Sequence, residues 1–397
     1  MKIKKSNKTK ITRGSAKKSK VTKITSSTKR KKAPVRAKKK EREIKKSISA
    51  VFVKPIENPI ILPEENNNWE VWQTFNPAAI LLKNKVHFVY RAIGEDYISR
   101  LGYAVSEDGF KIDERLPYPI YEHRPTTHCS PIHTTHSSPN PTFYSFASGG
   151  SFGGCEDPRI VRVDKEDVLY MTYTACDRGL RVGLTSIKIK DFLRKIWKWK
   201  SPKLISPPGE INKNYVIFPE KINGKYAILH SINPKVLITY VDSLEFEEGY
   251  YIYSHFGGGK AQNNCWDSEI RGAGPPPIKT KDGWLLFYHA IDKREPSKYK
   301  VGAMLLDLND PTRILHRSKE PILEPNEQYE NNGFKPGIVY ASGAVVKDDN
   351  LLIYYGGADS YVCVAYADFN EFLEALGKEV KPKVERKVLK KRKLDDS

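Results

Sequence analysis

Short apolar runs, broken by turn-forming residues, dominate residues 48–377. Runs of Val, Ile, Tyr and Phe alternate with Gly, Pro, Asn and Asp throughout this stretch. Such runs indicate β-strands joined by tight turns. Helical periodicity is confined to one short amphipathic stretch, Asp368–Leu376. We therefore expect an all-β fold over residues 48–377.

One pattern recurs five times along this stretch: a Pro- or Gly-rich start, an apolar strand, a turn, and an aromatic-rich strand. The copies align on Tyr90, Tyr173, Leu229, Tyr288 and Tyr355, which lie 83, 56, 59 and 67 residues apart. Propeller blades have four strands in repeats of roughly 40–50 residues, and four to eight blades are usual. The pattern predicts a five-bladed β-propeller. The alternative, a β-sandwich with an extra domain, does not explain five copies of one pattern.

The two ends of the chain differ in composition from the body. Residues 1–47 contain 21 Lys and Arg against 2 acidic residues, and residues 378–397 contain 9 against 4. Because these segments have little to bury, we expect disordered basic tails that make at most weak contact with polyanions. The body carries a net charge of −4, so the overall charge of +20 does not argue for a nucleic-acid enzyme. We expect a single catalytic domain, 48–377, between the tails.

The chain lacks the sequence signals of membrane insertion and secretion. No stretch approaches 18 consecutive apolar residues, and no apolar segment follows the basic N-terminus. The five cysteines are odd in number and form no CxxC pair, which favours a reducing compartment. We expect a cytoplasmic protein.

Polar residues near the ends of the predicted inner strands supply the candidate chemistry. In a propeller these strand ends converge on one axial pocket, so polar residues from different repeats meet there. The residues concerned are Asn76, Arg91, Asp157, Lys213, Asn214, Asp267, His289 and Asp359. Carboxylates, amides and cations around one pocket are suited to binding a sugar with an anion next to it.

The segment Gly153–Arg159 is the most specific of these signals. Asp157 precedes Pro158, which predicts an extended backbone, and Arg159 would follow on the same face of the strand. Composition alone favours a structural interpretation, in which Asp157 caps a turn and pairs with Arg159.

A series of motifs runs in order along residues 70–375. They are Asn76-Pro77-Ala78, Tyr90-Arg91-Ala92, Glu156-Asp157-Pro158-Arg159, Phe218-Pro219-Glu220-Lys221, Gly272-Ala273-Gly274-Pro275-Pro276, Gly283-Trp284, Tyr288-His289 and Tyr355-Gly356-Gly357-Ala358-Asp359. Together they resemble glycoside hydrolase family 130, the family of β-mannoside phosphorylases and related hydrolases. The resemblance also implies the five-bladed propeller.

The resemblance implies a role for each site residue. Asp157 falls on the catalytic acid, which protonates the leaving glycosidic oxygen through a hydroxyl of the bound mannosyl unit. The sugar-binding positions are Asn76, Arg91 and Asp359, and the phosphate-binding positions are Lys213, Asn214 and His289. Inverting phosphorolysis needs one acid and no carboxylate base, because phosphate is the nucleophile. Inorganic phosphate is then a co-substrate, and we expect no other cofactor and no metal.

Two positions depart from the family pattern. The phosphorylases usually carry His-Arg where this chain has His230-Ser231, so one cation of the phosphate clamp is missing. Lys213 stands where another clamp position has Arg, and a lysine gives no bidentate fork. Arg271 and Lys260 are near enough in sequence to substitute.

Three functions follow from these observations. The first is phosphorolysis of β-mannosides, such as β-1,4-mannooligosaccharides, to mannose 1-phosphate. The second is hydrolysis on the same scaffold, suggested by Ser231; it would need a carboxylate base roughly 6.5–9.5 Å from the acid, for which Glu220 and Glu269 are candidates. The third is sugar or anion binding without catalysis, against which the intact Asp157 argues.

The segment Tyr121–Ala147 lengthens the connection between the first two repeats. It contains Cys129 and four histidines, His123, His128, His133 and His136. The spacing of the last two invites a metal-site interpretation, but no second paired motif accompanies it. We favour a long loop over the pocket mouth that shapes the acceptor site.

Overall fold

The structure of the chain is a computed structural model that describes residues 50–123, 148–176, 179–254 and 265–389. Most of its regular structure is β-strand, which confirms the all-β class. The helices in these residues are short: α2 (Ile189–Leu193), α3 (Gln328–Asn331) and α4 (Phe369–Gly377). The last is the helix expected at the end of the body, and the sequence did not predict the other two.

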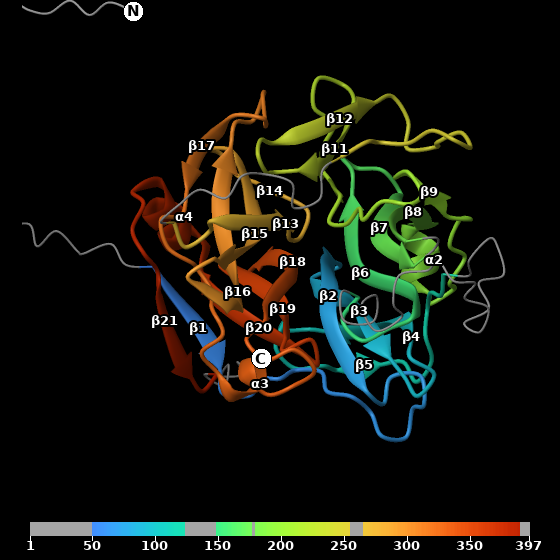
Figure 1. Cartoon of the computed structure of the whole chain (residues 1–397), viewed down its shortest axis with the longest axis horizontal. Coiled ribbons are helices and arrows are strands. Elements are labelled where there is room, and N and C mark those ends of the chain that lie inside the picture. Colours follow the sequence, from blue (N-terminus) through green and yellow to red (C-terminus); the bar gives the residue numbers. More distant parts are fainter. Residues whose placement is uncertain (1–49, 124–147, 177–178, 255–264, 390–397) are drawn as a thin grey trace, which may run out of the picture. The chain divides into compact units, whose positions relative to one another are not determined.

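The strands form four sheets, and the largest, within residues 73–204, consists of two mainly antiparallel groups (Figure 1). This gives five groups, called units 1 to 5 below, which follow the chain except that the first strand belongs to unit 5. Unit 1 contains β2 (Gln73–Leu82), β3 (Lys85–Ile93), β4 (Ile98–Ser106) and β5 (Glu114–Arg115). Unit 2 contains β6 (Gly153–Arg162), β7 (Val168–Cys176), β8 (Leu180–Lys188) and β9 (Lys203–Leu204). Unit 3 contains β10 (Val216–Ile217), β11 (Tyr226–Ser231) and β12 (Leu237–Val241).

The last two units contain the remaining strands. Unit 4 contains β13 (Glu269–Ala273), β14 (Ile278–Lys279), β15 (Trp284–Asp292), β16 (Glu295–Leu306) and β17 (Ile314–Arg317). Unit 5 contains β18 (Val339–Lys347), β19 (Asn350–Gly357), β20 (Tyr361–Asp368), β1 (Val51–Pro55) and β21 (Lys383–Lys387). A parallel bridge between β4 and β6 joins units 1 and 2, and no described sheet closes on itself.

The hydrophobic core is divided into five clusters, each of which packs two units together. Unit 1 packs on unit 2, unit 2 on unit 3, unit 3 on unit 4 and unit 4 on unit 5. The fifth cluster packs β2, β3 and β4 against β18, β19 and β20, so unit 5 contacts unit 1. The units therefore contact one another in a closed cycle, although no sheet is closed.

The N-terminal strand of the described residues belongs to the last unit. β1 pairs antiparallel with β20 and parallel with β21. The segment 378–397 was expected to be a disordered tail, and for residues 383–387 this prediction is wrong. Val384 packs against the core between units 4 and 5, and the alternation of strand side chains leaves the charged neighbours outside. The predicted tail 1–47 lies outside the described residues.

The aligned tyrosines of three units share one packing arrangement. Tyr90, Tyr173 and Tyr288 lie opposite Gly102, Gly183 and Gly302 on the neighbouring strand. A Cβ atom on these glycines would lie 2.3, 2.3 and 2.4 Å from the tyrosine Cζ. The glycine thus makes room for the ring, which explains why the repeats are recognisable by an aromatic at this position.

No helix in the described ranges is long and apolar enough to cross a membrane. The cysteines in these ranges, Cys155, Cys176, Cys265 and Cys363, are free thiols.

Candidate active site

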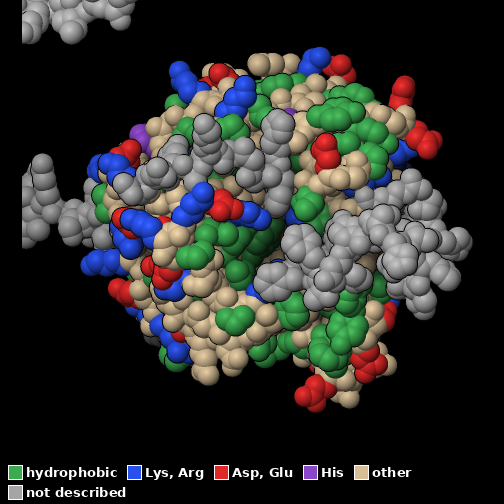
Figure 2. Space-filling model, viewed as in Figure 1, with side chains coloured by type: hydrophobic (Ala, Val, Ile, Leu, Met, Phe, Trp, Pro, Cys, Tyr) green, Lys and Arg blue, Asp and Glu red, His purple; other side chains and the backbone are tan. Residues whose placement is uncertain are grey.

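A cavity of about 590 Å³ lies at the end of the strands where β2 and β6 begin, and Figure 2 shows the molecule hollowed near its centre. Six of the seven predicted site residues line it: Asn76, Arg91, Asp157, Lys213, Asn214 and Asp359. They come from units 1, 2 and 5 and from the segment before β10. The structure therefore brings together residues almost 300 positions apart in the chain.

Four of these residues have a left-handed backbone. Asn76, Asp157, Asn214 and Asp359 have φ angles of 45, 49, 65 and 49°. Asn76 and Asp157 each occupy a β-bulge, where the strand register shifts. Bulges redirect side chains and are common beside active sites. The expectation of an extended backbone at Asp157 is wrong, because the bulge takes precedence over the preference imposed by Pro158.

The bulge also changes the partner of Asp157. It breaks the strand alternation, so the Arg159 side chain donates to the Asp157 carbonyl and not to its carboxylate. The carboxylate Oδ1 instead accepts from Asn76 Nδ2 at 2.8 Å and from Arg91 Nη1 at 3.1 Å. The predicted pair between Asp157 and Arg159 is therefore replaced by an ion pair with Arg91.

The surroundings of Asp157 favour its ionised form. Burial opposes its charge, but the nearby cations Arg91, Lys213 and Arg159 and the hydrogen bond from Asn76 hold the pKa of Asp157 well below its ordinary value. A general acid must carry a proton, so a further negative charge beside these cations is needed to raise the pKa of Asp157.

Glu156, the residue before Asp157, is a second carboxylate at the site, and it is fully buried behind the cavity wall. Its carboxylate lies 3.4 Å from Arg91 Nη2 and 2.9 Å from Lys213 Nζ. It also accepts from Cys176 Sγ at 3.2 Å, and burial beside Glu156 raises the pKa of that thiol. Glu156 therefore fixes two cations that face the cavity. The only sequence signal for Glu156 was its position in the motif Glu156-Asp157-Pro158-Arg159.

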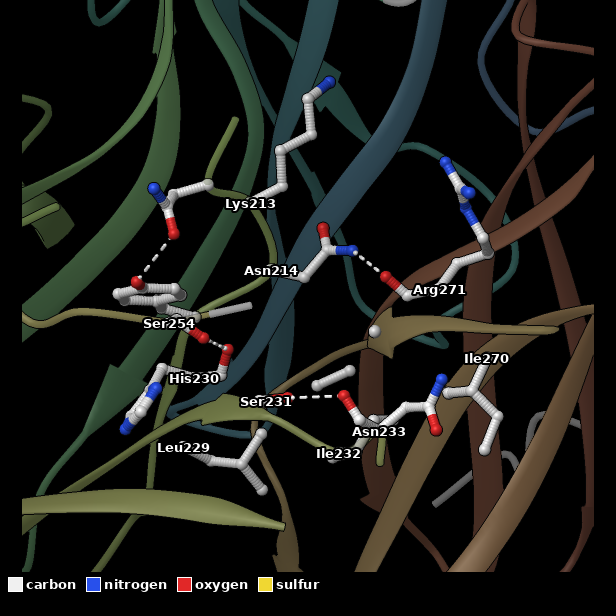
Figure 3. Close-up of a pocket in the computed structure, with 14 residues that line it drawn as sticks. Lys213, Asn214, Leu229, His230, Ser231, Ile232, Asn233, Ser254, Ile270 and Arg271 are labelled. Carbon is white, nitrogen blue, oxygen red and sulfur yellow. Dashed lines mark hydrogen bonds between the residues drawn. The ribbon is translucent and has the colours of Figure 1, made fainter. Parts of the chain in front are cut away.

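Hydrogen bonds from two buried residues fix the side chain of Asn214. Its Oδ1 accepts from Arg159 Nη2 at 2.8 Å and from the Tyr340 hydroxyl at 2.7 Å. Its Nδ2 is directed towards the Arg271 carbonyl at 3.4 Å. Figure 3 shows Lys213 and Arg271 on either side of Asn214, with their charged ends directed to the same side. Two cations and an amide thus face one part of the cavity.

Of the seven residues to which the family resemblance assigns a role, His289 is the one that does not line the cavity. Its ring stacks on Tyr340 with centroids 4.0 Å apart, and its Nε2 donates to the Ala341 carbonyl at 2.7 Å. Burial and the charge of Arg159 lower the pKa of His289 to about 3, so the ring is neutral. In this structure His289 supports Tyr340 from behind the wall.

Asp267 was expected to converge on the pocket, and this prediction is wrong. Its Oδ2 accepts from the Tyr288 hydroxyl at 2.6 Å and pairs with Arg317. Unit 1 has the same arrangement, in which Glu70 accepts from Tyr90 and pairs with Arg115. Asp267 is therefore a structural partner of the repeated tyrosine.

Ser231 lies in a separate small cavity of about 20 Å³ (Figure 3), the room of about one water molecule. Lys213, Asn214 and Arg271 border both this cavity and the large one. The Ser231 hydroxyl donates to the Asn233 carbonyl at 3.0 Å. The position at which the family carries an arginine is thus adjacent to the cation-lined part of the site.

The two candidate carboxylate bases for hydrolysis, Glu220 and Glu269, lie outside the large cavity. Glu220 pairs with Lys279, and Glu269 pairs with Arg271 at 2.6 Å. Neither lines the large cavity, whose carboxylates within the described chain are Asp157 and Asp359. Asp359 lies 3.3 Å from Lys335 Nζ.

Further cavity residues were missed by sequence reasoning. Phe334 and Lys335 precede β18, and Tyr299 lies on β16. Lys335-Pro336 is the start of the fifth copy of the repeated pattern, but the pattern assigned Lys335 no role, and it does not mark Phe334 or Tyr299. Of the four histidines in the segment Tyr121–Ala147, only His123 is described, and its Nδ1 lies 2.9 Å from the Tyr173 hydroxyl. Cys129, His128, His133, His136 and Lys260 lie outside the described residues. Among the residues that the structure describes, no cluster of His, Cys, Asp and Glu could hold a metal.

A cavity lined by amides, paired carboxylates, cations and tyrosines is typical of an enzyme that acts on carbohydrates. Residues 36–378 match the family model Glyco_hydro_130, described as beta-1,4-mannooligosaccharide phosphorylase. The chain belongs to this family of enzymes, glycoside hydrolase family 130.

Curated relatives and solved structures agree with this membership. The 1,2-beta-oligomannan phosphorylase of Thermoanaerobacter sp. (strain X514) is 39% identical over 79% of this chain and 96% of its own. The beta-1,2-mannobiose phosphorylase of the same organism is 34% identical over 77% and 94%. A solved GH130 structure, from work on family hydrolases that target β-1,2 mannosidic linkages in Candida mannan, is 26% identical with a TM-score of 0.62 and covers 81% of this chain and 94% of its own.

Proposed function

We propose that this chain is an inverting phosphorylase of β-mannosides. It transfers the terminal mannosyl unit to inorganic phosphate and releases mannose 1-phosphate and a shortened sugar. The observation that carries the proposal is the arrangement of one acid, Asp157, and a separate group of phosphate-binding donors, Lys213, Asn214 and Arg271, around a single cavity.

The proposed roles follow from the contacts. Asn76, Arg91 and Asp359 bind the hydroxyls of the mannosyl unit, and Asp157 supplies the proton to the leaving oxygen through one of those hydroxyls. Phosphate sits against Lys213, Asn214 and Arg271, and attacks the anomeric carbon from the face opposite the leaving group. Arg271 compensates for the clamp arginine replaced by Ser231. His289 acts through Tyr340, which holds Asn214.

Phosphate binding also offers a source for the acidity of Asp157. The charge of Lys213 is one of the causes that depress the pKa of Asp157. A phosphate dianion bound at Lys213 and Arg271 counters these cations, and its own negative charge disfavours the carboxylate. Both effects raise the pKa of Asp157 towards the working pH, where a general acid is most effective. A water nucleophile would provide neither effect.

Hydrolysis remains the second candidate, for two reasons. Ser231 removes one cation of the clamp, and the family includes hydrolases. Against it, the two glutamates expected to serve as base, Glu220 and Glu269, do not line the cavity. An inverting hydrolase needs a base with room for water between it and the acid. The pairing of Asp359 with Lys335 does not favour it in that role.

We infer a β-1,2 linkage rather than the β-1,4 linkage expected from the sequence. The two relatives that align over more than nine tenths of their own length are both named for β-1,2 substrates. The description of the family model, by contrast, names β-1,4-mannooligosaccharides. The proposed substrate is therefore a β-1,2-mannoside, with the β-1,4 isomer as the comparison in any assay.

We also propose that the five units are the blades of a five-bladed propeller. The closed cycle of five core clusters supports this, since each unit packs on its two neighbours in sequence and the last packs on the first. β1 in the last unit links the two ends of the cycle.

The deciding experiment uses β-1,2- and β-1,4-mannobiose, each with and without phosphate. We expect mannose 1-phosphate from the β-1,2 disaccharide in phosphate, and no cleavage in its absence. Release of free mannose at the same rate in phosphate-free buffer would establish hydrolysis instead. Faster cleavage of the β-1,4 disaccharide would reverse the linkage assignment.

A further inference from the structure

Three large aromatic side chains are exposed together on unit 1 and the start of unit 2. Trp72, Tyr97 and Phe152 are 53, 41 and 54% exposed. The ring centroids of Trp72 and Tyr97 are 5.4 Å apart, and those of Tyr97 and Phe152 are 5.8 Å apart. Contiguous exposed apolar surface of this kind often marks a binding site.

The aromatic cluster lies at the same strand ends as the cavity. Trp72 directly precedes β2, which carries Asn76, and Phe152 directly precedes β6, which carries Asp157. Tyr97 lies between β3 and β4, and its carbonyl accepts from the Phe152 amide at 2.9 Å. All three rings are therefore within five residues of a strand end that contributes to the site.

Hydrogen bonds from the side chain of Gln73 to backbone carbonyls join this cluster to the cavity wall. Gln73, next to Trp72, donates through Nε2 to the carbonyls of Gly149 at 3.0 Å and Asp359 at 2.6 Å. Gly149 and Asp359 both line the cavity, and Phe152 stands three residues after Gly149. The aromatic cluster is thus continuous with the rim of the cavity.

A fourth exposed aromatic ring, that of Phe334, belongs to the cavity itself. Phe334 lines the cavity and is 45% exposed. Its Cζ would lie 3.3 Å from a Cβ on Gly150, so its ring packs against the turn that leads to Phe152. An aromatic ring of the cavity therefore lies beside the turn that leads to Phe152.

We propose that Trp72, Tyr97 and Phe152 bind the sugar units of a β-mannoside oligosaccharide that lie beyond the disaccharide at the cleavage site. The proposal rests on the proposed function, since it assumes that the cavity holds the terminal mannosyl unit. Sugar rings have apolar C–H faces and polar edges. Half-exposed aromatic rings contact the faces and leave the hydroxyls in water. Oligomannosides of three or more units are then better substrates than the disaccharide.

The test compares chain lengths in matched variants. The variants are Trp72→Ala, Phe152→Ala and the control Tyr250→Ala, which removes a ring that is 46% exposed, stacks on Phe246 and does not line the cavity. For each, kcat/KM is measured with β-1,2-mannobiose and β-1,2-mannotetraose in phosphate. Calorimetric binding of both sugars without phosphate provides a readout independent of activity.

We expect the wild type to bind and cleave the tetraose better than the disaccharide. Trp72→Ala and Phe152→Ala should each weaken tetraose binding and kcat/KM about 3- to 10-fold, leaving the disaccharide and the Tyr250→Ala protein unchanged. Equal wild-type affinity for the two sugars, or an equal loss in Tyr250→Ala, would overturn the proposal. A change in oligomeric state with unchanged sugar binding would also overturn it, and would assign the cluster to self-association. If the protein binds the tetraose as expected but shows no phosphorolysis, the proposed function is rejected and the binding proposal stands.

Discussion

Replacing Gly356 by alanine should impair the enzyme through a residue that does not line the cavity. A Cβ at this position would lie 2.0 Å from Asn76 Oδ1 and 3.2 Å from its Cγ, so the Asn76 amide must move. That amide donates through Nδ2 to Asp157 Oδ1 at 2.8 Å. A hydrogen bond to a charged group contributes roughly 1.5–3 kcal/mol, which corresponds to a loss in kcat/KM of about 10- to 150-fold.

The assay is the rate of mannose 1-phosphate release by Gly356→Ala, with the thermal midpoint measured in parallel. Gly377→Ala is the control, because a Cβ there meets nothing within 4 Å. A double-mutant cycle with Asn76→Ala tests the route of the effect. In the Asn76→Ala background the clashing amide is absent and only the backbone N of residue 76, 3.0 Å from the added Cβ, stays close, so Gly356→Ala should have a clearly smaller further effect. An equal loss in both backgrounds, or wild-type activity in Gly356→Ala, would refute the reasoning.

Further predictions concern the catalytic acid, the phosphate site, the stability of the fold and the N-terminal tail. Asp157→Asn should lower kcat by at least about 10²–10⁴-fold while leaving the fold intact, and near-normal turnover would exclude Asp157 as the acid. Ser231→Arg should lower the phosphate concentration needed for half-maximal phosphorolysis by about 10-fold or more, measured from initial rates. Lys54→Met removes the cation paired with the fully buried Glu330 and should reduce the free energy of unfolding by about 3–5 kcal/mol in urea titrations. Deleting residues 1–47 should leave phosphorolysis of disaccharides unchanged while weakening retention on a polyanion column.

The parts of the site that were predictable are those tied to the repeat. Asn76 and Asp157 occupy equivalent bulges in β2 and β6, each followed by a proline, so their convergence follows from the repeated unit. His289 and Asp267 also occupy repeat positions, but their side chains are used to pack the wall and to bind Tyr288. Which face of a strand a residue presents depends on local register shifts, and a single sequence does not reveal those.

Other parts were not predictable because they depend on contacts between distant segments. Lys335 begins the fifth copy of the repeated pattern and Phe334 precedes it, but the pattern does not reveal that this irregular connection reaches the cavity. The C-terminal strand β21 is predominantly charged, and its pairing depends on the free edge of β1, more than 300 residues earlier. Composition correctly separates the tails from the body in charge, but it does not show where a charged segment finds an unpaired strand edge.

The place of β1 in the last unit has a consequence for how the protein is made. Val53 leaves the ribosome early, yet its partner Tyr366 is synthesised 313 residues later. At about 5–20 residues per second, β1 waits roughly 15–60 s for that partner. Until β20 and β21 are synthesised, both edges of β1 lack their strand partners, although Lys54 can pair with Glu330 somewhat earlier. A stalled or truncated nascent chain would therefore expose these edges. Chains ending before residue 361 should therefore be aggregation-prone and dependent on chaperones.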